Sequence, residues 1–166
     1  MEEPLDAGLW NPPVVDPDQS IDTAMLIEQY KTYVSLADKV SERRSTANSF
    51  FLAIHSAAVA VLAVLWKDRP VDVSPWLLIL PCVIQTLVCI WWWTLLQRYR
   101  KLNSVKFAVV GALERQLPAS PWWAEYQELK RQASGKGYPS LARVESMIPI
   151  AFGALYIGGL VVAVSA

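Results

Sequence analysis

Three long apolar stretches without a charged side chain constrain this sequence more than any other feature. They cover residues 49–66, 76–96 and 147–164, which is 18, 21 and 18 residues. An α-helix rises about 1.5 Å per residue, so each stretch forms about 27 to 31 Å of helix, close to the roughly 30 Å hydrocarbon core of a bilayer. Only 18% of all residues are charged. The sequence therefore predicts an all-α membrane protein with three transmembrane helices.

The segments between these stretches predict the topology. Pro70 and Pro75 lie in the short outer loop, residues 67–75, so the first two spans form an antiparallel hairpin. Nine Lys and Arg residues lie in 97–146, and none lies after the third span. Because basic residues favour the cytoplasmic side, we expect the N-terminus inside and the C-terminus outside. The acidic start of the chain lacks the basic segment of a signal peptide, and we expect none.

Helices are predicted to extend the first two spans into the cytoplasm. Residues 1–19 form an acidic, Pro-rich tail, whereas no Pro or Gly occurs between Gln19 and Trp66, so the cytoplasmic helix 20–48 runs into the first span. Its apolar residues recur at spacings of 4, 3, 4 and 3, a coiled-coil-like seam for a partner helix: Leu26, Tyr30, Tyr33, Ala37 and Val40.

Residues 97–146 are expected to hold further cytoplasmic helices and a loop. The second span continues as a helix until Leu117-Pro118, and Ser120-Pro121 begins a short helix with a cap and a proline in its first turn. In the third span, Pro149 is interpreted as a residue of the first helical turn.

Few residues offer chemistry. His55, within the first span, and Gln85, within the second, are candidate pore-lining or proton-relay groups, because ionisable groups inside a membrane are usually functional. We favour a packing interpretation, a hydrogen bond from His55 to Gln85 or Thr86. A zinc site with Cys82 and Cys89 lacks a fourth ligand, so neither a metal nor a cofactor nor a catalytic residue is expected.

Small residues form ridges that allow helices to approach closely. One ridge runs down the first span, and a second set lies on the third span: Ser49, Ala53, Ser56 and Ala60, then Gly158 and Gly159. One ridge is expected to pack within the hairpin and another between protomers. The sequence leaves open which does which.

Two arginines lie where the first helix enters the membrane. Arg43 and Arg44 are expected to bind the phosphates of anionic lipids of the inner leaflet. Alternatively, one of them pairs with an acid from another helix, Glu114 or Glu145. Anionic lipid also explains the basic stretch 97–106, so no nucleic-acid partner is expected.

Several short motifs together resemble the RipA family of octameric bacterial membrane proteins. They lie at residues 29–34, 37–44, 47–51, 102–107, 113–114, 117–118, 144–145 and 148–149. Arg43-Arg44 followed by Ala47-Asn48-Ser49-Phe50 is also similar to SLATT domains, membrane modules thought to form pores in bacterial antiphage defence.

The resemblance implies a homo-oligomer, an octamer, in the bacterial cytoplasmic membrane, and it implies no enzyme activity. We therefore expect a non-enzymatic ring that acts as a scaffold or regulatory protein, with itself and membrane lipids as partners. The alternative is a pore-forming or membrane-disrupting effector of a bacterial defence or stress system.

The net charge of zero hides two charged segments of opposite sign. Residues 1–48 carry nine acidic and four basic side chains, and residues 97–146 carry nine basic and four acidic ones. We predict that an acidic N-terminal helix lies against a basic helix, so 1 M salt loosens the assembly by screening these charges. Native mass spectrometry and protease sensitivity measure this, and unchanged stoichiometry and cleavage in high salt would contradict it.

Overall fold

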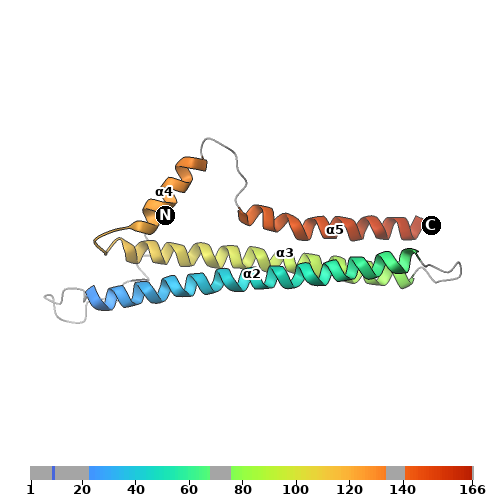
Figure 1. The fold of residues 1–166 in the computed structure, drawn as a ribbon, viewed down its shortest axis with the longest axis horizontal. Coiled ribbons are helices and arrows are strands. Elements are labelled where there is room, and N and C mark those ends of the chain that lie inside the picture. The colour runs from blue at the N-terminus through green and yellow to red at the C-terminus, as the bar shows by residue number, and fades with distance from the viewer. Residues whose placement is uncertain (1–8, 10–22, 68–75, 134–140, 166) are drawn as a thin grey trace. The chain divides into compact units, whose positions relative to one another are not determined.

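The computed structural model describes residue 9 and residues 23–67, 76–133 and 141–165. The helices are α2 (Thr23–Lys67), α3 (Trp76–Glu114), α4 (Pro121–Ala133) and α5 (Leu141–Ser165), shown in Figure 1. No strand occurs in these described ranges. The predicted start of the first helix, near residue 20, and residues 68–75 of the predicted outer loop 67–75 lie outside the described residues, whereas Lys67 is the last residue of α2. The all-helical fold class is thus confirmed.

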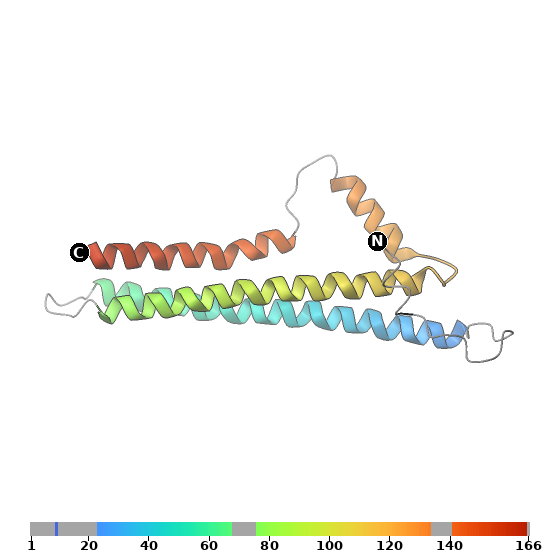
Figure 2. The ribbon, with the colours of Figure 1, turned by 180° about the vertical axis from the view of Figure 1, so that it is seen from behind.

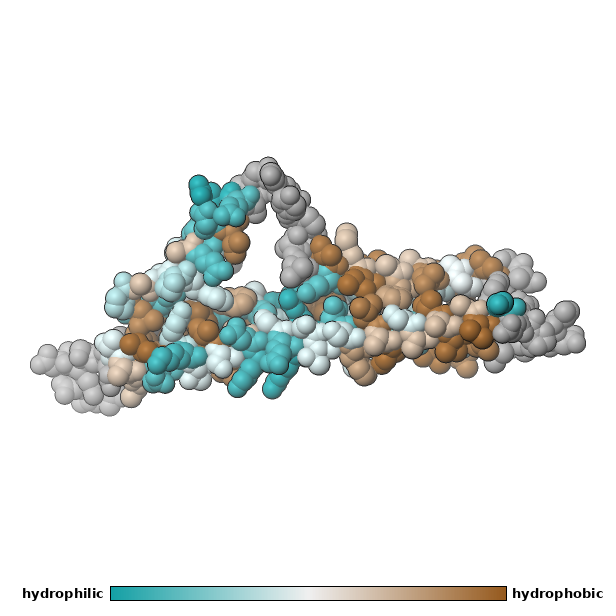
Figure 3. Space-filling model, in the orientation of Figure 1, coloured by the Kyte–Doolittle hydropathy of each residue, from teal (hydrophilic) through white to brown (hydrophobic). Residues whose placement is uncertain are grey.

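Two of the helices are much longer than a membrane is thick. α2 has 45 residues and α3 has 39, which correspond to about 68 and 58 Å of helix. Each of α2, α3 and α5 contains a window long and apolar enough to cross a membrane. In Figure 3, brown apolar side chains gather over one part of α2 and over α5, while α4 is mostly teal. The expectation that the first two spans continue into long polar helices is confirmed.

The helix ends differ from the predicted ones at two places. α3 ends at Glu114, three residues before Leu117, and the amides of Gln116 and Leu117 donate to carbonyls three residues earlier. Leu117 precedes Pro118, which disfavours the α conformation and explains the tighter turn. α5 begins at Leu141, so Pro149 lies inside this helix and not in its first turn. The interpretation of Pro149 as a helix-initiating residue is therefore wrong.

The chain divides into two compact units. The first comprises residues 1–41 and 101–138, and the second comprises residues 42–100 and 139–166. In the first unit, α2 and α3 lie side by side in both ribbon views (Figures 1 and 2). Buried Leu26 packs there with Val109 and Leu113, and Tyr30 and Tyr33 cover this core. The seam that was predicted on the first helix thus faces α3 of the same chain.

Polar and charged side chains also join α2 and α3 in this unit. Asn103 donates a hydrogen bond to the hydroxyl of Ser41 over 3.0 Å, and the Lys106 ammonium lies 5.4 Å from the ring centre of Tyr33. The part of α2 before the membrane, residues 23–48, carries three acidic and four basic residues. The described part of this helix is therefore not acidic, since six of the nine acids counted in residues 1–48 belong to residues 1–22, and the predicted charge pairing with residues 97–146 remains a prediction. All of those six lie outside the described residues.

The second unit contains the three apolar spans. Phe51, Trp92 and Leu96 form its buried core, and the rings of Phe51 and Trp92 stack with centroids 5.5 Å apart. Ile148 and Phe152 of α5 pack against this core. Each of α2, α3 and α5 therefore contributes to one aromatic core.

The small residues take different positions in this unit. A side-chain carbon added at Gly159 would lie 3.9 Å from the sulfur of Cys82, so Gly159 faces α3, whereas Gly158 has nothing within 4 Å. The ridge on α2 is exposed along its whole length, at Ser49, Ala53, Ser56 and Ala60. Within one chain, α5 thus approaches α3 at Gly159, and the small-residue ridge of α2 stays exposed.

The core of the first unit can be tested at Leu113, which is 3% exposed. We expect Leu113→Ala to lower the free energy of unfolding of this unit by about 2–5 kcal/mol, because it leaves a cavity between α2 and α3. Pulse proteolysis in urea measures this effect. The control Met25→Ala, at a site that is 62% exposed, should change stability by less than about 0.5 kcal/mol. Equal effects of the two substitutions would refute the assigned packing.

Candidate functional site

His55 lies in the interior of the membrane-spanning unit. Its ring is fully buried and stacks on Trp92 of α3 and on Phe152 of α5, with centroids 5.4 and 5.3 Å apart. Its Nδ1 lies 3.1 Å from the hydroxyl of Tyr156, and its Nε2 lies 3.7 Å from the sulfur of Cys89. His55 therefore joins α2 to both other spans.

The predicted hydrogen bond of His55 to Gln85 or Thr86 is wrong. The Thr86 hydroxyl donates to the carbonyl of Cys82 in its own helix over 2.8 Å, and Gln85 Oε1 is buried without a hydrogen-bond partner. The prediction considered only the first two spans. The third span supplies the partner instead, because the hydroxyl of its Tyr156 lies next to the imidazole of His55. Sequence reasoning missed Tyr156, although it is the single tyrosine of that span.

The described part of the chain contains no group of three His, Cys, Asp or Glu side chains that could hold a metal ion. Cys82 and Cys89 are free and buried. The His55 cluster thus pairs one imidazole with neutral hydroxyl and thiol groups, an arrangement that suits packing and hydrogen bonding.

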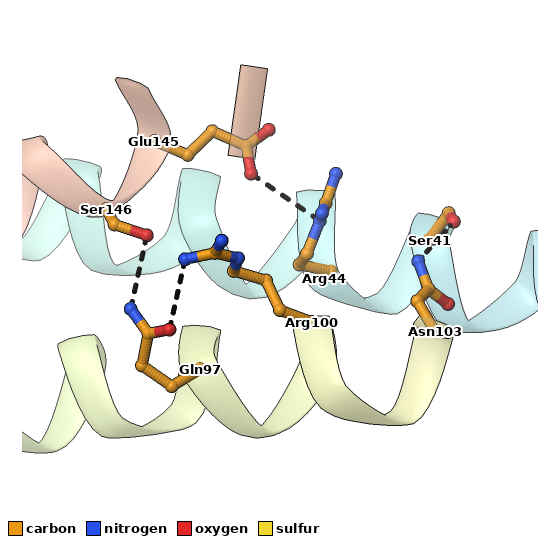
Figure 4. A network of polar contacts seen from close by, with 7 residues as sticks. All are labelled: Ser41, Arg44, Gln97, Arg100, Asn103, Glu145 and Ser146. Carbon is orange, nitrogen blue, oxygen red and sulfur yellow. Dashed lines mark hydrogen bonds and ion pairs between the residues drawn. The ribbon is translucent and has the colours of Figure 1, made fainter. Parts of the chain in front are cut away.

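A second set of polar contacts lies in the same unit, at the polar end of the spans (Figure 4). The Nε atom of Arg44 lies 3.5 Å from Glu145 Oε2, a distance that makes an ion pair and not a good hydrogen bond. Gln97 donates to the hydroxyl of Ser146 over 3.4 Å and accepts a hydrogen bond from Arg100 over 3.1 Å. These contacts tie α5 to α2 and α3.

The four charged residues singled out at this boundary take different places. Arg44 is close to Glu145, with side-chain exposures of 19% and 23%, whereas Arg43 is exposed. Glu114 belongs to the other unit, where its partners are Tyr30 and the first turn of α4. The geometry therefore places one arginine in an ion pair and leaves its neighbour free to face lipid.

Glu114 is fully buried and holds the start of α4. Its Oε1 accepts the amide of Trp122 over 2.9 Å, and its Oε2 accepts the amide of Trp123 over 3.0 Å. These amides belong to the first turn of α4, where helix donors lack partners of their own and where the helix dipole favours a negative charge. Glu114 thus caps α4 from the end of α3.

The same carboxylate also accepts a hydrogen bond from Tyr30 of α2 over 3.2 Å. Burial raises the pKa of the Tyr30 phenol, and the adjacent Glu114 charge and the hydrogen bond raise it further. The phenol therefore stays protonated and keeps donating. One carboxylate joins α2, α3 and α4, a role that sequence reasoning missed because the spacing of Glu114 to Trp122 fits no local capping motif.

A family model matches most of the chain. The model of the octameric membrane protein family matches residues 27–165. The chain belongs to this family. Comparison with curated proteins and with solved structures gave no match. Membership agrees with the resemblance seen in the sequence, and the matched range includes His55, Glu114 and the Arg44–Glu145 pair.

The capping role of Glu114 yields a testable prediction. We expect Glu114→Ala to destabilise the start of α4 by about 1–3 kcal/mol, because two amides and the Tyr30 hydroxyl lose their acceptor. Hydrogen exchange of the first turn of α4 should accelerate correspondingly. Glu125→Ala is the control, since Glu125 is an exposed acid of the same helix. Unchanged exchange in the Glu114 variant would contradict the capping role.

The Arg44–Glu145 pair yields another prediction. Arg44→Glu should lower the stability of the membrane unit by about 1–2 kcal/mol, because it sets two acids side by side. Adding Glu145→Arg should restore most of the loss, as measured by thermal unfolding in lipid nanodiscs. Arg43→Glu is the matched control for lipid contact. If it costs as much as Arg44→Glu and the double variant brings no recovery, lipid binding and not the ion pair is what matters.

Proposed function

We propose that this chain forms an octameric ring in the bacterial inner membrane and acts there as a non-enzymatic scaffold or regulatory protein. Its family is defined by octameric membrane proteins, and this match carries the proposal. The N-terminus and the 97–146 segment face the cytoplasm, in line with the distribution of Lys and Arg.

Exposed apolar side chains on the spans support assembly within lipid. Val61, Leu87 and Val161, one on each span, are 59%, 61% and 62% exposed in the single chain. The exposed small-residue ridge of α2 is suited to close contact with a neighbouring protomer, because small side chains let helix backbones approach. Both surfaces thus fit lipid or another copy better than water.

Anionic lipid is the second proposed partner. Arg98, Arg100 and Lys101 follow directly on the second span, and all three are exposed. Basic side chains just inside the membrane bind the negatively charged headgroups of the cytoplasmic leaflet. This placement supports the proposed orientation as well.

A pore-forming effector is the alternative, and the geometry supports it less. His55, the main candidate for a pore-lining group, is enclosed by aromatic rings from α3 and α5. A side chain enclosed in this way cannot line a channel between protomers without repacking of the unit.

The experiment is native mass spectrometry from lipid nanodiscs, combined with conductance in planar bilayers. The proposed function predicts eight copies per particle with bound anionic lipid, and no current. Monomers alone would refute the ring. A current that is lost in His55→Leu while the assembly persists would refute the scaffold function and support the pore-forming effector.

A further inference from the structure

Two arginines at the polar end of the membrane unit belong to one polar network (Figure 4). Arg44 of α2 forms an ion pair with Glu145 of α5. Arg100 of α3 donates a hydrogen bond to Gln97, which in turn donates one to Ser146, the next residue of α5. The network thus ties two guanidinium groups to the same turn of α5, and they share one carboxylate.

Most of the guanidinium donors in this network have no protein acceptor in the described part of the chain. A guanidinium carries five N–H donors. Arg44 makes no hydrogen bond to a described residue, since its Nε lies 3.5 Å from Glu145, and Arg100 makes one, from its Nη1 to Gln97. The side chain of Arg44 is only 19% exposed. A partly buried charge with unfilled donors is costly, so the network favours an anion that accepts from both arginines.

The charges of the network lie at the depth of the lipid phosphates. Arg44 precedes the first apolar run by five residues, Arg100 follows the second by four, and Glu145 precedes the third by two. At about 1.5 Å per residue, these intervals place them about 3–8 Å beyond the hydrocarbon core, within a headgroup layer that is roughly 5–8 Å thick on each side. The anion available at this depth is the phosphodiester of a phospholipid.

We propose that Arg44 and Arg100 together bind the phosphodiester of one anionic phospholipid per protomer. Guanidinium groups bind phosphate oxygens through two parallel hydrogen bonds, and Glu145 holds Arg44 in place for this contact. A headgroup without an ammonium suits the network best, because the two arginines exceed the one carboxylate. The site rests on the lipid partner of the proposed function and assigns it a place among the three spans.

Arg98 distinguishes this site from a general attraction of basic residues to the membrane. It is exposed like Arg100 and lies two residues away on the same helix, which places it about 200° around α3. A general attraction predicts similar losses of lipid from substitution of either arginine. The proposed site predicts a loss from Arg100 alone.

Native mass spectrometry of the full chain in mild detergent, titrated with phosphatidylglycerol, gives an apparent Kd per protomer. Arg100 is exposed, so we expect Arg100→Gln to fold and to weaken binding by about tenfold, the effect of one lost hydrogen bond to a charged group. Arg98→Gln should weaken it by less than about twofold. Equal effects of the two substitutions would overturn the site.

Two competing ligands test the chemical class. We expect phosphatidylcholine with the same acyl chains to bind about tenfold more weakly, because its ammonium meets a network with excess positive charge. An excess of inorganic phosphate should leave phosphatidylglycerol bound. Equal binding of the two lipids would overturn the anionic class, and complete displacement by inorganic phosphate would overturn the assignment to lipid.

Glu145→Gln provides a change of opposite sign. It removes the carboxylate that competes for Arg44, so we expect the Kd for phosphatidylglycerol to fall by about twofold or more although an ion pair between the spans is lost. If Arg44 only held α5 in place, the same substitution would leave binding unchanged or weaken it. Either of those results would overturn the role of Arg44 in the site.

The number of copies in the same spectra separates this site from the proposed ring. Monomers that bind phosphatidylglycerol through Arg100 would refute the ring and keep the site. Eight copies whose lipid binding is unaffected by Arg100→Gln would refute the site and keep the ring. If no phosphatidylglycerol binds, the site and the proposed lipid partner both fail.

Discussion

A segment that crosses hydrocarbon must satisfy every backbone amide and carbonyl within itself, because no water is present to bind them. The three apolar stretches therefore form helices, in which each backbone amide finds its acceptor within the same segment. In α2 and α3 the helical hydrogen bonding continues well past the membrane boundary, over 45 and 39 residues. Both helices are therefore longer than a span requires, and each supplies residues to both units of the chain.

Polar side chains then join helices that lipid alone would not hold together, since the hydrophobic effect does not act between helices already in hydrocarbon. His55 and Glu114 are both fully buried, and each contacts two other helices. Each thus joins three helices of its own unit: His55 lies among aromatic rings of the spans, and Glu114 holds the start of α4 in the other unit. A charged group without partners in either place would be costly, so the partners are part of the fold.

Much of the fold could be predicted from local sequence. The apolar runs, the absence of helix breakers before Trp66 and the Ser120-Pro121 start of α4 are each read within one segment. The partners of buried polar groups could not be predicted, because they depend on which faces of distant helices meet. His55 binds Tyr156, 101 residues away, and Tyr30 binds Glu114, 84 residues away. The charge of residues 1–48 differs from that of the described part of α2, because six of the nine acids belong to residues 1–22.

The contact between Glu114 and α4 has a mechanical consequence. A carboxylate at the end of a 39-residue helix holds two backbone amides of the next helix, and the five-residue step from Arg115 to Ala119 is all that separates Glu114 from the capping residue Ser120. The first turn of α4 is therefore tied to the end of α3 twice, by five residues of chain and by two hydrogen bonds. A displacement of the end of α3 cannot leave the first turn of α4 in place without breaking these two bonds.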